Sequence, residues 1–383
     1  MQVEADPIET LRTRTSEKWS EYPDDVLPMF VAELDFPLAE PISEALIAAI
    51  RRSDTGYGGP DAALPEAFAA FAERRWGWQV DPAQVSTTTD VSVVIVESLR
   101  RVAKRGDGVI IMPPVYPPFF DLPREAGCRV VEVPLIDDGV SWSMDLDGIE
   151  RALASGAATT VLLCNPHNPL GLVHSRAQLE ALADIVTRHD GAVVSDEIHA
   201  PLTFAGATFT PYLSVGDDAR SHAIAAHSAS KGWNLAGLKC AMFVTAAERM
   251  AGIVRGLPEE VHFRTGLLGR LASTIAFTDG VDWLDGVCAA IESNARLLTS
   301  LLGERMPQVA YREPRASYLG WLDLRELGWG DNPAAVALER ARVALTDGPQ
   351  FGRPGRGFAR INMGCSPAML TEAITRLADA ARA

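Results

Sequence analysis

Residues 223–234 read AIAAHSASKGWN, an apolar run that passes directly into a turn of small residues carrying Lys231. Short apolar runs of this kind recur along the chain, at 109–112, 130–135, 161–164, 192–195, 223–226 and 241–244. Several of them are continuous and not alternating, which is typical of strands covered on both faces. Segments with helical period lie between the runs. The pattern therefore predicts an α/β fold with a mainly parallel central sheet between helix layers.

One intervening segment, 176–188 (RAQLEALADIVTR), has a clear amphipathic period. Leu179, Leu182, Ala183 and Val186 share one stripe, and charged residues occupy the other side. The spacing predicts a crossover helix over 176–188.

The regular alternation of runs is lost toward both ends of the chain, before about residue 45 and after about residue 278. Helical and Gly/Pro-rich stretches replace it there. We therefore predict a large three-layer domain over 46–278 and a smaller α/β domain built from both chain ends, 1–45 and 279–383.

The composition is that of an ordinary globular protein, because 47% of the 383 residues are hydrophobic and 22% are charged. The net charge of -15 argues against a surface that binds a phosphate backbone. No apolar run approaches the ~18 residues of a membrane span, and residues 1–14 are acidic and polar where a secretion signal is cationic and then apolar. We expect a cytoplasmic protein with neither nucleic acid nor membrane as a partner.

Five cysteines lie far apart, with no CxxC pair and no histidine at ligand spacing. This pattern does not predict a metal site, and reduced thiols in or near the core account for it.

Polar residues that directly follow buried strands are the first candidates for chemistry, because reactive groups collect where parallel strands end. Lys231 follows one run within Ser228–Asn234 (SASKGWN). Small neighbours let its amine approach a carbonyl ligand closely, and partial desolvation leaves the amine neutral enough to form an imine. The alternative is an ordinary solvated surface lysine.

Asp196 follows a second run, in SDEIH (195–199). An aspartate at the end of a buried strand needs a cationic partner or several donors to stay ionised. A protonated pyridine nitrogen is one such partner, and a helix N-cap or a structural ion pair is the alternative.

Asn168 follows a third run, in NPHNPLG (165–171). Two Asn-Pro pairs closing on Gly171 indicate a sharp turn, and turn chemistry alone would explain them. The functional interpretation is that an Asn amide donates to the phenolic oxygen of a cofactor. We interpret His167 as a turn residue, not a base.

Together, and in this order, these three motifs resemble those of the fold-type I enzymes that use pyridoxal 5'-phosphate (PLP), the class I and II aminotransferase family. The resemblance implies the PLP-dependent transferase fold with this cofactor. It assigns Asn168 to the ring hydroxyl, Asp196 to the pyridine nitrogen, Lys231 to the covalent bond with the aldehyde, Ser228 to the phosphate and His199 to the neighbourhood of the ring hydroxyl.

Further positions match the family pattern. Tyr57, in Gly56-Tyr57-Gly58, resembles the tyrosine that reaches the phosphate and substrate of the neighbouring subunit, which implies a homodimer with shared sites. Asp90 and Val91 resemble the phosphate loop at a helix start, although the family often has Gly where Asp90 stands.

Three more residues complete the set implied by the resemblance. Tyr116 matches the aromatic residue that stacks on the ring, with a core aromatic as the alternative. Lys239 falls where many relatives have a phosphate-binding arginine. Arg360 matches the arginine whose bidentate fork holds the substrate α-carboxylate.

Within the family, the chain is most similar to the MalY/PatB group of cystathionine β-lyases. The motif MFVAELDF (29–36), NPHNPLG, SDEIH and SASKGWNLAGLK (228–239) carry this similarity, and Pro201 departs from the group's usual Asp, so that the substrate-facing wall is expected to differ. The resemblance implies cleavage of L-cystathionine, or a related cysteine S-conjugate, to a thiol such as L-homocysteine, pyruvate and ammonia. Two alternatives stay open: an aminotransferase, and a regulatory protein that keeps the fold.

Overall fold

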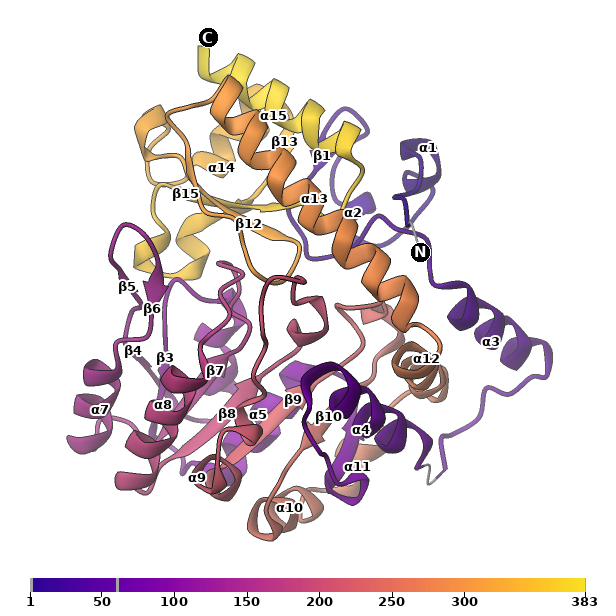
Figure 1. The fold of residues 1–383 in the computed structure, drawn as a ribbon, viewed down its shortest axis with the longest axis vertical. Coiled ribbons are helices and arrows are strands. Elements are labelled where there is room, and N and C mark those ends of the chain that lie inside the picture. Colours follow the sequence, from indigo (N-terminus) through magenta and orange to yellow (C-terminus); the bar gives the residue numbers. More distant parts are fainter. Residues whose placement is uncertain (1–2, 60–61, 383) are drawn as a thin grey trace.

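The computed structural model describes residues 3–59 and 62–382, and it has two main sheets (Figure 1). The larger sheet has the strand order β2-β10-β9-β8-β7-β3-β4. Its strands are β2 (Val85–Thr88), β3 (Gly108–Ile111), β4 (Arg129–Glu132), β7 (Thr160–Cys164), β8 (Ala192–Asp196), β9 (Ala223–His227) and β10 (Ala241–Val244). Only β10 runs antiparallel to its neighbours. The predicted α/β fold with a mainly parallel sheet is confirmed.

Both faces of this sheet are buried, as the continuous apolar runs predicted. In β3, Val109 and Ile111 pack into one hydrophobic cluster, whereas Ile110 packs into the other. Side chains alternate across a strand, so the two clusters lie on opposite faces. Each of the six predicted runs forms a strand; the additional strand, β2 (VSTT), is too polar to stand out in the sequence.

Helices cover the two faces. One layer contains α5 (Val91–Val102) and α10 (Glu248–Arg255), and the other contains α7 (Leu146–Ala154) and α8 (Arg176–Arg188). The helix predicted over 176–188 is confirmed as α8. It begins at a capping box, in which Ser175 and Gln178 exchange side-chain to backbone hydrogen bonds. The remaining helices are α1 (Ile8–Leu11), α2 (Glu17–Ser20), α3 (Glu40–Arg51), α4 (Ala63–Trp76), α6 (Leu122–Glu125), α9 (Asp217–His222), α11 (Glu259–Phe263), α12 (Leu267–Thr278), α13 (Val281–Arg305), α14 (Pro333–Val336) and α15 (Pro367–Arg382).

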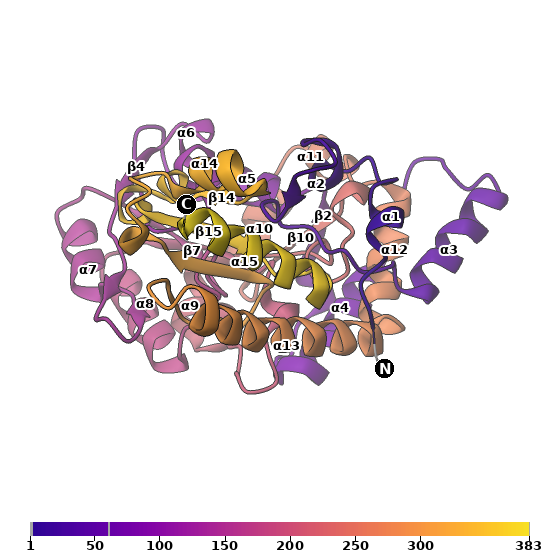
Figure 2. The same ribbon diagram turned by 90° about the horizontal axis from the view of Figure 1, so that it is seen from above.

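The smaller sheet is antiparallel and comes from the C-terminal part of the chain. Its order is β11-β12-β15-β14, and α13 and α15 run side by side next to it (Figures 1 and 2). Its strands are β11 (Ala310–Tyr311), β12 (Leu319–Asp323), β14 (Thr346–Asp347) and β15 (Phe358–Asn362). The remaining strands form two two-stranded sheets. One pairs β5 (Ile136–Asp137) with β6 (Trp142–Ser143), and the other pairs β1 (Leu27–Pro28) with β13 (Val343–Ala344).

The β1–β13 pair ties the N-terminal segment to the C-terminal part, as expected for a smaller unit built from both chain ends. The boundary at 278/279 follows the end of α12, whereas the boundary at 45/46 lies within α3. The division of the chain into these two domains stays a prediction. Across residues 3–59 and 62–382, no helix combines the length and apolar character that a bilayer crossing requires.

The capping box of α8 gives a stability test. Replacing Ser175 by Ala removes the acceptor for the Gln178 amide, and we expect a loss of about 1 kcal/mol in the free energy of unfolding. Chemical denaturation followed by circular dichroism measures it. Ser221→Ala, which removes an exposed hydroxyl from α9, is the control and should change stability by less than about 0.5 kcal/mol. Equal losses in both variants would contradict the role of the capping box.

Candidate active site

A cavity of about 900 Å³, its open mouth included, lies at the carboxyl ends of the parallel strands. Cys164 and Asp196 end β7 and β8 side by side, and the N-terminus of α5 forms another part of the wall. Eight of the residues predicted from the sequence line it, namely Asp90, Val91, Tyr116, Asn168, Asp196, His199, Lys231 and Arg360.

Lys231 is half-buried at the wall, in the turn that follows β9. Its Nζ donates a hydrogen bond of 2.9 Å to the carbonyl of Ala32. Burial, together with the positive charge of Arg360, lowers the pKa of Lys231 to about 8. An appreciable fraction of this amine is therefore neutral near physiological pH, as a nucleophile or base must be.

Asp196 is a buried carboxylate, 4% exposed, at the end of β8. Its Oδ1 accepts one hydrogen bond, 3.1 Å from the amide of Ile198. Among residues 3–59 and 62–382 no cation lies within ion-pair distance of it, and burial raises its pKa to about 7. A cationic ligand in the cavity would restore the ionised form, so the site has a place for a positive nitrogen.

Arg360 is the opposite case, a guanidinium only 5% exposed on β15. It donates to three neutral acceptors, Asn168 Oδ1 at 3.1 Å, the Phe30 carbonyl at 3.0 Å and Thr346 Oγ1 at 3.1 Å. Within the part of the chain that the structure describes, its Nε has no partner, and burial lowers its pKa to about 10. A buried cation with only neutral partners favours binding of an anion such as a carboxylate.

Asn168 and Tyr116 lie at the same part of the wall. Because Asn168 Oδ1 accepts from Arg360, its Nδ2 group is left to donate. Burial, and then the nearby Asp196 carboxylate, raise the pKa of Tyr116 to about 12, so its phenol stays protonated. An aromatic face and an amide donor therefore border the same space.

His199 is buried and hydrogen-bonded through Nδ1 to Ser317 Oγ at 3.0 Å. Burial, with the positive charges of Lys231 and Arg360, lowers its pKa to about 3. The imidazole is therefore neutral at physiological pH and acts by hydrogen bonding and packing.

The start of α5 forms the polar end of the cavity. Asp90 is the N-cap residue but makes no side-chain capping bond, so the first amides of the helix, at Val91 and Ser92, stay available to an anion. The Asp90 carboxylate instead pairs with Lys239 Nζ at 3.1 Å. Lys239 is not among the lining residues, and its pairing neutralises the acidic side chain beside this anion site.

Two predicted site residues, Ser228 and Tyr57, and the departure from the group's pattern at Pro201 lie elsewhere or behind the wall. Ser228 is buried and bonds Ser230 Oγ and the Cys240 carbonyl, each at 2.7 Å, so that Ser230 is the serine at the wall. Tyr57 is 89% exposed and is not among the residues that line this cavity. Pro201 is buried next to Gly232 and does not line the cavity, so this departure from the group's pattern acts at most through packing.

The sequence did not reveal the role of segment 30–34. The Ala32 carbonyl accepts from both Lys231 and the Tyr318 hydroxyl, the latter at 2.8 Å. A backbone carbonyl leaves no mark in a sequence, although the motif around it was noticed. Tyr318 is 1% exposed and would have been taken for a core aromatic.

Across residues 3–59 and 62–382, no group of three His, Cys, Asp or Glu side chains is placed to hold a metal ion.

The chain is similar to known proteins over nearly its whole length. The sequence model of the family "Aminotransferase class I and II" matches residues 24–377. A Mycobacterium tuberculosis protein, provisionally named a cystathionine beta-lyase, is 43% identical over 97% of this chain and 96% of its own length. The cystathionine beta-lyase PatB of Bacillus subtilis is 33% identical over 92% of each chain. A crystal structure from Corynebacterium diphtheriae, provisionally assigned as a PLP-dependent beta-cystathionase, superposes with a TM-score of 0.94 at 34% identity, covering 100% of this chain and 99% of that one.

The lowered pKa of Lys231 can be tested on the chain without ligand. Trace labelling with acetic anhydride across a pH series, read by mass spectrometry of the peptide that contains Lys231, should reach half its maximum near pH 8, because the amine loses its proton there and not near the ordinary value of 10.5. Arg360→Met should move this midpoint upward, since it removes a positive charge. A midpoint near 10.5 in both proteins would contradict the described environment.

Proposed function

Because this chain belongs to the class I and II aminotransferase family, we propose that it is a PLP-dependent carbon-sulfur β-lyase. Its substrate is L-cystathionine or a related cysteine S-conjugate, and its products are a thiol such as L-homocysteine, pyruvate and ammonia. The observation that carries the proposal is the buried Asp196 carboxylate, which has no cation of the described chain beside it and shares a cavity with a desolvated lysine amine.

The residues of the cavity fit PLP by their chemistry. Asp196 would hold the protonated ring nitrogen, Lys231 would bond covalently to the aldehyde, and Asn168 would donate to the ring hydroxyl, with His199 nearby. Tyr116 would stack on the ring. These assignments would give partners to the Asp196 carboxylate and to the free Nδ2 group of Asn168.

The phosphate would lie at the start of α5. The backbone amides of Asp90 and Val91 would donate to the phosphate there. Ser228 would contribute together with Ser230, to which it is hydrogen-bonded. Lys239 would contribute positive charge while it compensates Asp90. The acidic side chain is therefore compatible with an anion site, because its charge is already paired.

The chain's own groups then perform the remaining work. Bound PLP withdraws electrons from the substrate's α-carbon, so that a thiolate on the β-carbon can leave. The Arg360 guanidinium would hold the α-carboxylate through its positive charge and its free Nε–H group, which would fix the α-proton relative to the Lys231 amine. Once the substrate's amino group has replaced Lys231 at the aldehyde, the freed Lys231 amine would take this proton. The overall reaction consumes one molecule of water for each molecule of thiol, pyruvate and ammonia that it releases.

Release of pyruvate distinguishes this function from aminotransfer. Purified protein given PLP and L-cystathionine, with no keto acid added, should form pyruvate and free thiol in equal amounts, measured with lactate dehydrogenase and a thiol reagent. Lys231→Ala should lower the rate by at least about 100-fold, because the base is lost. Strict dependence of turnover on an added keto acid would instead establish an aminotransferase.

We also propose that the enzyme is a homodimer. Ile47 (48% exposed), Ile50 (58%) and Phe263 (54%) present apolar side chains to solvent, and Tyr57 packs on Phe263 with ring centroids 5.8 Å apart. Both views place α3, which carries the two isoleucines, at the periphery of the molecule (Figures 1 and 2). A second copy related by two-fold symmetry would cover this face and bring Tyr57 to the phosphate and substrate of the partner's cavity.

Sedimentation tests the dimer. The wild type should have twice the mass of the 41.2 kDa chain, and Ile47→Asp/Ile50→Asp should shift it toward the single chain, because charges would be buried in the interface. Val140→Asp, at an apolar residue that is 83% exposed between β5 and β6, is the matched control and should leave the mass unchanged. A wild type that sediments as a single chain at micromolar concentration would contradict the proposal.

The cytoplasm is the compartment that we propose for this activity. All five cysteines are free thiols, and all are buried. Reduced thiols are the normal state in the cytosol, where disulfides are rare.

A further inference from the structure

Residues 30–35 are here called the wall segment, because Val31 and Ala32 within them line the cavity. Every carbonyl from residue 30 to residue 34 accepts a hydrogen bond from a side chain. Arg360 donates to the Phe30 carbonyl and Lys231 to the Ala32 carbonyl. The two cations of the cavity therefore take part of their orientation from this backbone.

The rest of the wall segment is held by two asparagines. Asn362 Nδ2 donates to the carbonyls of Val31 and Glu33, at 2.7 and 2.6 Å. Asn234 bonds both the amide and the carbonyl of Leu34, each at 3.0 Å. Asn362 is on β15, two residues after Arg360, and Asn234 is three residues after Lys231. β15, which carries Arg360, and the turn that carries Lys231 therefore also form hydrogen bonds with the wall segment.

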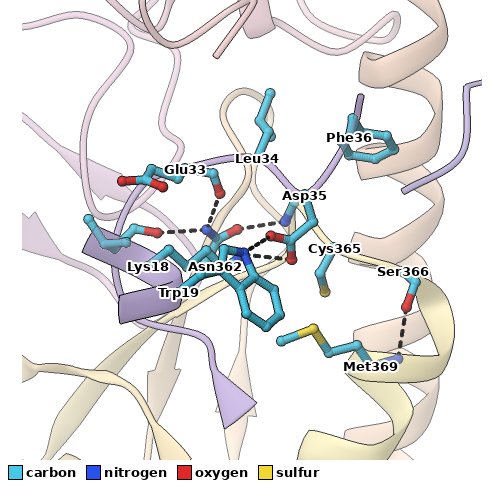
Figure 3. Close-up of polar contacts among 12 residues, drawn as sticks. Lys18, Trp19, Glu33, Leu34, Asp35, Phe36, Asn362, Cys365, Ser366 and Met369 are labelled. Atoms are coloured by element: carbon cyan, nitrogen blue, oxygen red, sulfur yellow. Dashed lines mark hydrogen bonds and ion pairs between the residues drawn. The ribbon is translucent and has the colours of Figure 1, made fainter. Parts of the chain in front are cut away.

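The wall segment ends in a buried ion pair. Asp35 Oδ2 accepts from Lys18 Nζ at 2.8 Å, and both side chains are 0% exposed. Asp35 Oδ1 accepts from Trp19 Nε1 at 2.9 Å. Figure 3 shows Lys18 and Trp19 converging from α2 on this carboxylate, with Asn362 beside them.

Three parts of the chain meet at Asp35. Its amide donates to the Gly364 carbonyl at 2.8 Å, and its carbonyl accepts from the Asp6 amide at 2.8 Å, while its carboxylate binds α2. A four-residue helix such as α2 has little stability of its own, so these contacts hold it in place. They fix Asp35 with respect to the N-terminal segment and to the end of β15 together.

Stability alone does not explain a fully buried ion pair, because an apolar pair of similar volume is often as stable or more stable. Such a pair can instead specify one geometry, because each buried charge is stable only when it is paired with the other. Here the geometry that it defines is the end of the wall segment, directly after the carbonyls that orient Lys231 and Arg360.

We propose that Lys18, Trp19 and Asp35, here called the clasp, are positioning residues for the reaction. They fix the wall segment, and through the Phe30 and Ala32 carbonyls they orient Arg360 and Lys231. The kinetic part of this inference rests on the proposed lyase function; the structural part does not. When the clasp loosens, the guanidinium loses a fixed acceptor and the substrate carboxylate is held less well.

The test uses the double variant Lys18→Met/Asp35→Asn. It removes both charges, keeps similar volumes and leaves an amide oxygen for Trp19, so we expect it to fold. Hydrogen exchange of the Leu34 and Asp35 amides in cofactor-free protein should become at least 10-fold faster than in the wild type. In the loaded enzyme, KM for L-cystathionine should rise at least 10-fold, with kcat counted per bound cofactor by absorbance.

KM separates positioning from mere loss of folded protein, which lowers the amount of active enzyme but leaves KM unchanged. Trp19→Phe keeps an aromatic side chain but removes the Nε1 donor together with part of the ring system, and it should shift exchange and KM in the same direction by a smaller factor. Asp25→Asn is the matched control, since it breaks the exposed Asp25–Arg342 pair of the same N-terminal segment, and it should change neither quantity.

Wild-type exchange together with wild-type KM in the double variant would overturn the proposal. So would a raised KM of equal size in Asp25→Asn, because any disturbance of the N-terminal segment would then suffice. If the wild type released no pyruvate, the proposed lyase function would be rejected. Hydrogen exchange of the Leu34 and Asp35 amides in the double variant would still test whether the clasp fixes the wall segment.

Discussion

Buried charge without a counter-ion is the constraint on which the cavity depends. Asp196 and Arg360 are each at least nine-tenths buried, and their contacts within the described chain are to neutral groups. Isolated burial of this kind is costly, so a protein keeps it only where a ligand completes the pairing. In the proposed function, a cationic ring nitrogen and a carboxylate would complete the two pairs, and Lys231 lines the same cavity with an amine that burial has made easier to deprotonate.

The two charges come from different sheets, so the chemistry depends on how these sheets meet. Asp196 ends β8 of the parallel sheet, whereas Arg360 lies on β15 of the antiparallel one. The contact between Arg360 and Asn168 crosses from one sheet to the other. The wall segment, a stretch without regular secondary structure, joins the same two parts, because its carbonyls accept from Lys231 and from Arg360.

Much of this was predictable from the sequence, for physical reasons. β7, β8 and β9 are continuous apolar runs because both of their faces are buried, and the polar residues after them meet because parallel strands end at one edge. Other features needed the structure. The partners of Ala32 are contacts of a backbone carbonyl, the Lys239–Asp90 pair joins residues far apart in sequence, and the Lys18–Asp35 pair looks like two ordinary surface charges until its burial is known.

The covalent bond between Lys231 and the cofactor is the central claim, and reductive trapping tests it most directly. Protein loaded with PLP is treated with borohydride, digested and mapped by mass spectrometry, in parallel with Asp196→Asn. We expect the adduct on Lys231, together with a visible absorbance band in the wild type that changes in Asp196→Asn because the ring nitrogen loses its carboxylate partner. An adduct on another lysine, or none on Lys231, would contradict this description of the site.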